Sequence, residues 1–179
     1  MRKVSDESFL NEICLWYEKY QVLKLTHYQL IDILSYDSTK REVINIFLSY
    51  QSKKREVEAF LDELHKLLEK EDFDINTDLI LIRRKKQGKD WEFSTPYTLL
   101  ELDYDAEDVV SRLKESKTEE YSETKIDKDD TNPPLLFVFG KDINGRLIYI
   151  KLKIRDQQKQ VLCVSFHYAR EKMNFPYTE

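Results

Sequence analysis

Apolar residues occur at every second position in the last third of the chain, which is the pattern of a β-strand with one buried face. The first such run follows Asn144 and Gly145, a pair that favours a two-residue hairpin turn. It predicts a hairpin with the preceding apolar segment 135–139. The residues expected on the buried side of the run are Ile148, Ile150, Leu152 and Ile154.

A second alternating run follows a polar turn around Gln157 and Gln158. The residues expected on its apolar side are Leu162, Val164, Phe166 and Tyr168. Because side chains alternate along a strand, pairing the two apolar sets places the other residues of both strands on one shared face. That polar face is expected to display Tyr149, Lys151, Lys153, Arg155, Val161, Cys163, Ser165 and His167.

Apolar residues at helical spacing dominate the first 70 residues and predict three helices, the last running from about residue 38 toward Glu69. The polar run 51–55 interrupts this last helix, as an exposed face or a hinge. We take it as the boundary between an N-terminal helical extension, residues 1–55, and a main domain, residues 56–179.

Shorter elements are expected between the helices and the hairpin. The apolar run 79–82 predicts a strand, Thr95 before Pro96 predicts the start of a helix, and 106–114 predicts another helix. The polar stretch that ends at Pro134 is expected to be a loop. Together these elements predict an α+β fold, in which an antiparallel sheet of three to four strands packs on helices.

The formal net charge of the 179-residue chain is −5, which argues against a protein that coats nucleic acid through excess positive charge. Basic residues nevertheless predominate from Thr131 to Glu179, where eight Lys or Arg stand against four Asp or Glu. A local site for a phosphate group is therefore compatible with the composition.

Cys14 and Cys163 lie far apart and outside any metal or redox spacing, which is typical of a reducing cytoplasm. No run of about 18 apolar residues predicts a membrane span, and the N-terminus turns acidic at Asp6, where a signal peptide would be apolar. His27 and His65 have no partner at metal-ligand spacing. We therefore expect a cytoplasmic protein without a membrane segment or a bound metal.

Four motifs of the C-terminal region stand in an order and spacing shared with a known family. They are Phe137-Val138-Phe139-Gly140-Lys141, Tyr149-Ile150-Lys151-Leu152-Lys153, Cys163-Val164-Ser165-Phe166-His167 and Phe175-Pro176-Tyr177. In these motifs the chain resembles the MqsR family of toxins from bacterial toxin-antitoxin systems, and a fainter likeness extends the resemblance over residues 56–179. The resemblance implies a RelE-like fold and an endoribonuclease that cleaves mRNA without a metal or other cofactor and is silenced by an antitoxin protein.

Carried over residue by residue, the family's catalytic tyrosine matches Tyr149. A family lysine that follows Ser-Phe on the last strand matches His167, and another lysine matches Ser122. The family's glutamine falls near Leu136. The resemblance therefore implies the family fold with an altered set of catalytic side chains.

Cleavage of RNA without a metal needs a base for the 2′-hydroxyl, a cation for the phosphate and an acid for the leaving oxygen. We predict His167 as the titrating group, Tyr149 as the residue that stacks on a base or orients the phosphate, and Lys151 as a phosphate-holding cation. The further residues expected to bind a single-stranded RNA substrate are Lys153, Arg155, Lys141 and Ser165.

A hypothesis of a different class stays open beside this one. A histidine near a strand end is often structural, and Tyr-Lys-Lys on a strand is ordinary surface decoration in many sheets. The chain is then a catalytically inactive MqsR-like or RelE-like scaffold that binds another protein, as a phage or mobile-element inhibitor or regulator. The acidic balance supports this alternative, because acidic surfaces attract basic partners.

Overall fold

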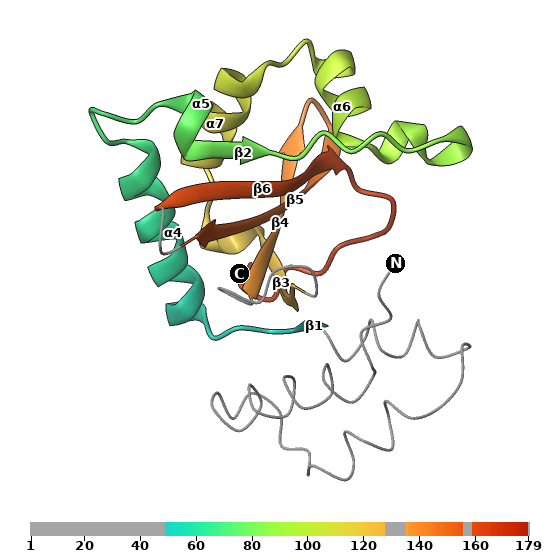
Figure 1. Cartoon of the computed structure of the whole chain (residues 1–179). Helices are drawn as coiled ribbons and strands as arrows, with labels where there is room; N and C mark the ends of the chain where they lie inside the picture. The colour runs from blue at the N-terminus through green and yellow to red at the C-terminus, as the bar shows by residue number, and fades with distance from the viewer. Residues whose placement is uncertain (1–48, 128–134, 156–158, 179) are drawn as a thin grey trace, which may run out of the picture. The chain divides into compact units, whose positions relative to one another are not determined.

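The computed structural model describes residues 49–127, 135–155 and 159–178 (Figure 1). The chain divides into two compact units, Met1–Leu48 and Ser49–Glu179, and all described residues belong to the second. The first two predicted helices therefore lie outside the described residues. No helix within the described ranges is long and apolar enough to cross a membrane.

A six-stranded sheet forms the centre of this unit, in the order β1-β3-β4-β5-β6-β2. The strands are β1 Ser49–Tyr50, β2 Leu79–Leu81, β3 Tyr121–Ile126, β4 Leu135–Ile143, β5 Arg146–Arg155 and β6 Gln160–Tyr168. All neighbours are antiparallel except β2, which runs parallel to β6. A mixture of helices and a largely antiparallel sheet was predicted correctly, whereas the expected three to four strands are in fact six.

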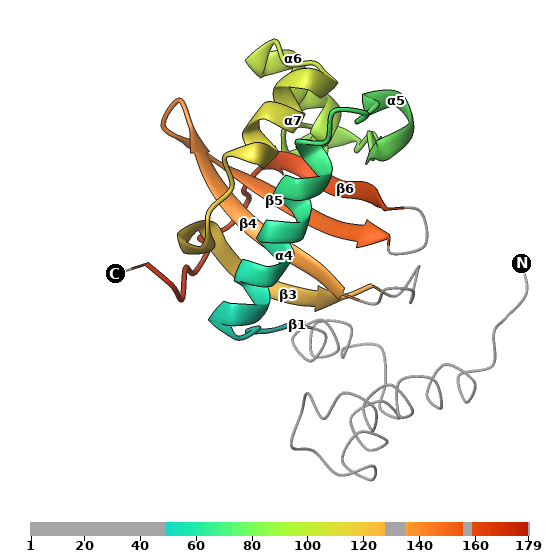
Figure 2. The ribbon, with the colours of Figure 1, turned by 90° about the vertical axis from the view of Figure 1, so that its left-hand side faces the viewer.

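Helices cover one face of this sheet. They are α4 Lys54–Leu68, α5 Ile75–Asp78, α6 Thr95–Leu102 and α7 Ala106–Lys114, with short 3-10 turns η2 Gly88–Phe93 and η3 Thr118–Glu120. Figure 2 shows α4 lying across the strands, and its buried residues recur three or four positions apart, from Val57 to Leu68. The predicted helix 106–114 is confirmed, with Val109, Val110 and Leu113 in the core.

The predicted hairpin is also confirmed. Asn144 and Gly145 join β4 to β5 with φ angles of 56° and 78°, the left-handed values that a tight two-residue turn requires. All four residues expected on the apolar side of β5 are buried in the core.

One register shift in β6 changes the sidedness of its first half. Lys151 pairs with Ser165, but the next residue of β5, Leu152, pairs with Cys163, so that Val164 is an extra residue in β6. Cys163 and Val161 consequently lie in the core cluster and not on the polar face, where strict alternation had placed them. Ser165 and His167, beyond the bulge, keep the predicted face.

Two segments were predicted incorrectly because each pairs with a distant part of the chain. The expected loop contains β3, whose buried hydroxyls satisfy one another: Thr124 Oγ1 lies 2.8 Å from Ser52 Oγ and 2.8 Å from the Tyr121 hydroxyl. Within the described residues, the expected long helix begins at Lys54, because Ser49–Tyr50 pairs with β3 as a strand. The pairing of polar side chains in these two segments cannot be read from the periodicity of apolar residues.

The N-cap of α6 lies one residue before the predicted position. Ser94, and not Thr95, caps α6, since its side chain accepts a hydrogen bond from the Tyr97 amide. Thr95 is then the first residue of the helix, and its hydroxyl accepts a hydrogen bond from the Phe166 amide.

Lys153 carries a charge into the interior. It follows Lys151 by two residues on β5, yet its side chain is only 1% exposed and its Nζ lies 2.8 Å from Asp127 Oδ2. An ammonium buried to this extent is tolerated only beside a carboxylate that compensates it. Lys153 therefore has a structural role in the interior of the protein.

Replacing Lys153 by methionine is expected to lower the free energy of unfolding by about 3–5 kcal/mol, because the Asp127 carboxylate loses the ammonium that compensates it in a largely dry site. Urea unfolding followed by circular dichroism measures the loss. Lys54→Met removes the same charge from an exposed position and should change little. Equal effects of the two substitutions would contradict the structural role of the ion pair.

Candidate functional site

A cleft of about 780 Å³ opens on the polar face of the sheet, opposite the helices. Strands β1, β3, β5 and β6, the segment before η2 and the tail after β6 supply its walls. Its lining residues are Ser49, Tyr50, Gln51, Lys86, Ser122, Glu123, Lys125, Tyr149, Lys151, Ser165, His167, Ala169, Arg170, Glu171, Lys172, Met173 and Asn174. Five of these are Lys or Arg and two are Glu, so the cleft favours an anion on a protein of net charge −5.

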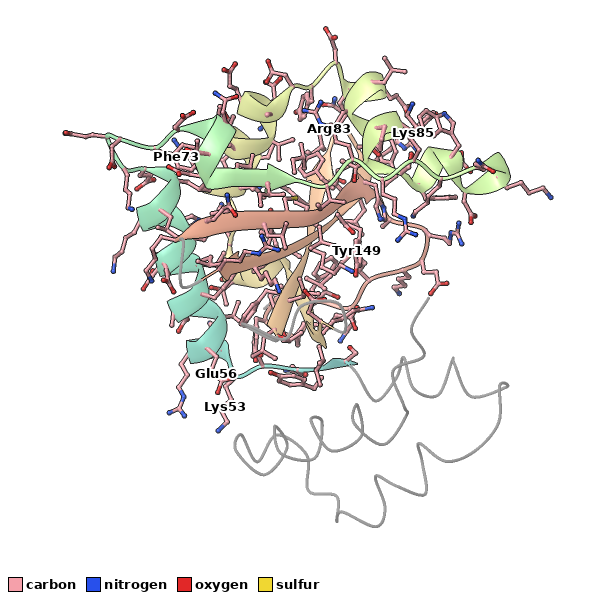
Figure 3. The ribbon with its side chains drawn as sticks, viewed as in Figure 1. Lys53, Glu56, Phe73, Arg83, Lys85 and Tyr149 are labelled. Atoms are coloured by element: carbon pink, nitrogen blue, oxygen red, sulfur yellow. The ribbon has the colours of Figure 1, made fainter. Side chains whose placement is uncertain are left out.

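Tyr149 and His167 form the floor of the cleft. They are direct cross-strand partners in the β5–β6 ladder, and their rings stack with centroids 5.3 Å apart and planes 14° from parallel. Lys151 and Ser165 are the next paired residues on the same face. Figure 3 marks Tyr149 on this part of the sheet. Register alone thus brings together four residues predicted from the sequence.

The hydrogen bond of His167 fixes its tautomer. Its Nδ1 lies 2.9 Å from the carbonyl oxygen of Tyr168, and because a carbonyl only accepts, Nδ1 carries the proton. Burial lowers the pKa of His167, and the charges of Lys86, Lys151 and Arg170 lower it further, against the opposing effect of the Tyr168 bond. The imidazole is therefore neutral at pH 7 and presents an unprotonated Nε2.

The hydroxyl of Tyr149 is held by a charged pair from β3. Lys125 Nζ lies 2.9 Å from Glu123 Oε1 and also donates a hydrogen bond to the Tyr149 oxygen. Burial raises the pKa of Tyr149 more than the nearby ammonium lowers it. Burial lowers the pKa of Lys125, but the phenol and the carboxylate outweigh it and the net shift is upward. A protonated phenol thus faces a charged ammonium.

Three residues predicted to bind substrate do not line the cleft. Lys141 pairs with Ile148 on the helix-covered side, where its Nζ lies 3.0 Å from Glu120 Oε1. Lys153 pairs with Asp127, and Arg155 lies opposite Gln160 at the far end of β5. The register of β4 against β5 decides the position of Lys141, and no motif reveals that register.

Several cleft residues were missed by sequence reasoning. Lys125 comes from β3, which was expected to be a loop, and it shares that strand with Ser122, where the resembled family has a lysine. Lys86 comes from a basic run after β2, and its Nζ donates to the Phe93 carbonyl oxygen at 2.6 Å. Arg170 pairs with Asp90 and lies over the Phe93 ring at 5.0 Å. Only the basic run was visible as a pattern.

The segment after β6 forms one wall of the cleft and returns toward β3 (Figure 1). Tyr177 stacks on Tyr121 at 5.7 Å, and its hydroxyl donates to the Ser52 carbonyl oxygen. Phe175 and Met173 approach the backbone of Gly140 so closely that a Cβ there would lie 2.7 Å from the Phe175 ring and 2.9 Å from the Met173 sulfur. Gly140 therefore has a steric role under this wall.

Comparisons with protein-family models, with curated proteins and with solved structures found no match to this chain. Within the ranges that the structure describes, no group of three or more His, Cys, Asp or Glu side chains is arranged to hold a metal ion. The chemistry of the cleft residues is therefore the evidence for its function.

Gly140→Ala is expected to push Phe175 and Met173 away from the sheet and to cost about 1–3 kcal/mol of stability, as overpacking of a close contact does. Thermal unfolding measures this cost. Adding Phe175→Ala removes the nearest clash, so the double variant should lose less than the sum of the two single losses. Additive losses would show that the wall does not rest on Gly140.

Acidification is expected to destabilise the protein through His167. Its pKa is below 6.5 in the folded state, so the unfolded chain takes up the proton first and the free energy of unfolding falls as the pH drops below about 6.5. Above that pH both states are neutral and the effect vanishes.

Urea titrations of the wild type and of His167→Gln across this range isolate the effect of His167, because the other histidines are common to both proteins. The stability of the wild type relative to the variant should rise with pH up to about 6.5 and then level off. A difference independent of pH would argue against a buried neutral imidazole.

Proposed function

We propose that this protein is an endoribonuclease that cleaves single-stranded RNA without a metal, as a toxin of the MqsR kind that its motifs resemble. The observation that carries the proposal is the neutral His167, with Nε2 as acceptor, stacked on the protonated Tyr149 in a basic cleft. An antitoxin protein that occludes the cleft, in a bacterial cytoplasm, is the partner this function requires.

His167 acts as the base in this proposal. Its Nε2 takes the proton of a ribose 2′-hydroxyl, and the 2′-oxygen then attacks the adjacent phosphorus. Because the pKa of His167 is lowered, most molecules have the base form ready at neutral pH. Lys151, paired with Ser165 beside this ring, holds the non-bridging oxygens as negative charge develops on them.

Tyr149 acts as the acid. As the bond from phosphorus to the 5′-oxygen breaks, the phenol gives its proton to that oxygen, and the Lys125 ammonium stabilises the phenolate left behind. The products are a 2′,3′-cyclic phosphate and a free 5′-hydroxyl. Transfer of the proton from His167 back to Tyr149, through solvent, restores the site.

The flat rings of Tyr149 and His167 also suit a single strand. Unpaired bases stack on aromatic side chains, whereas bases inside a duplex are not accessible to them. We therefore take single-stranded mRNA as the substrate. Lys125 supplies an ammonium near the position where the family lysine is replaced by Ser122, which compensates for one of the three departures from the family pattern.

The purified protein is expected to cleave a single-stranded RNA in the presence of EDTA and to leave 2′,3′-cyclic phosphate ends. His167→Gln and Tyr149→Phe should each lower the rate by about 10²–10⁴-fold, as the loss of a general base or acid does. His65→Gln and Tyr104→Phe, the same changes outside the cleft, should leave the rate unchanged.

A substrate with 2′-deoxyribose at the cleaved position provides a second test, since it lacks the nucleophile and should resist cleavage. Full activity of His167→Gln, or cleavage of the deoxy substrate, would refute the mechanism. Absence of any cleavage by the wild type, together with tight binding of a basic protein, would instead favour the catalytically inactive scaffold.

A further inference from the structure

A basic run leaves β2 at the edge of the cleft. Between Asp78 and Asp90 the chain has five Lys or Arg and no acidic residue. Arg83, Arg84 and Lys85 are exposed, while Lys86, the next residue, lines the cleft. The run therefore continues the positive charge of the cleft outward along the surface.

The charges of this run are not neutralised by neighbours. Among the described residues, no carboxylate forms an ion pair with Arg83, Arg84 or Lys85, in contrast to cations such as Lys125, Arg112 and Arg146. A second basic run, Lys53–Arg55, is followed at once by Glu56 and Glu58 on the same helix. The run after β2 therefore attracts an anion more strongly than the run Lys53–Arg55 does.

Both ends of the run are attached to the fold. The Ile82 amide donates to the Cys163 carbonyl oxygen at 2.9 Å, which keeps the chain beside β6, and Lys86 is held by the Phe93 carbonyl oxygen. Three residues span at most about 11 Å, at roughly 3.3–3.6 Å each, so all three cations lie close to the cleft edge. Figure 3 shows Arg83 and Lys85 beyond β6 from Tyr149.

We propose that Arg83, Arg84 and Lys85 bind the phosphates of the RNA strand where it leaves the cleft past Lys86, so that the protein recognises an extended single strand. The inference rests on the proposed function for the identity of the strand. Contacts to the phosphate backbone carry no base preference, and they strengthen with the length of strand that reaches them.

The test compares two triple variants of the full chain that remove the same charge. One is Arg83→Gln, Arg84→Gln and Lys85→Gln, and the control is Lys53→Gln, Lys54→Gln and Arg55→Gln. Fluorescence anisotropy measures the binding of labelled RNAs of about 3 and about 12 nucleotides, which bracket the usual footprint of a single-strand site. All proteins carry His167→Gln in addition, so that the RNA stays intact.

The first variant should bind the longer RNA several-fold more weakly than the control, with the short RNA unaffected. Its plot of log affinity against log salt should be shallower by roughly 2, since each phosphate contact contributes about 0.7 for a single strand. Equal affinities and slopes in the two variants would overturn the inference. So would equally tight binding of a polyglutamate of matched charge, which would mark the run as a site for acidic peptides.

Cleavage by the proteins with His167 intact separates this inference from the proposed function. In the first variant we expect length-dependent binding to be lost and cleavage of the short RNA to be retained. This result would show that the substitutions remove the contribution of the basic run alone. Length-dependent binding without cleavage by the wild type would support the basic run and refute the nuclease. Cleavage by both variants with the same dependence on RNA length would support the nuclease and refute the role of the basic run.

Discussion

The register between β5 and β6 is the constraint on which the cleft depends. It sets Tyr149 directly against His167, and Lys151 against Ser165, so that two strands supply the floor without any contribution from a loop. A slip of β6 by one residue against β5 would turn Ser165 and His167 toward the helices. The apolar partners on the other face, Ile150 opposite Phe166 among them, hold the pairing in place because both are completely buried.

Electrostatics give the cleft a character different from that of the whole chain. Its wall residues bring Lys86 and Arg170 close to an imidazole that is already partly buried, and both effects disfavour a charged His167. The same positive charge that keeps this ring neutral also attracts an anion. Binding and proton acceptance are therefore served by one arrangement, on a protein whose net charge is negative.

The sequence predicted those elements that follow a regular period. The hairpin at Asn144, the buried side of β5 and the helix 106–114 all depend on local spacing and turn chemistry, which a single sequence displays. It did not reveal β3, where buried hydroxyls replace apolar alternation, or the side of the sheet on which Lys141 lies. These depend on pairing between distant segments. For the same reason Lys125, an essential part of the proposed site, had no signal.

The bulge at Val164 divides β6 into two parts that are under different constraints. Before the bulge, Cys163 is constrained by packing in the core. After it, Ser165 and His167 are constrained by the chemistry of the cleft face. Homologous chains are therefore expected to drift independently in the two parts. A relative with a one-residue gap at this position would have lost the offset, and its downstream residues would have to be realigned before any function is transferred to it.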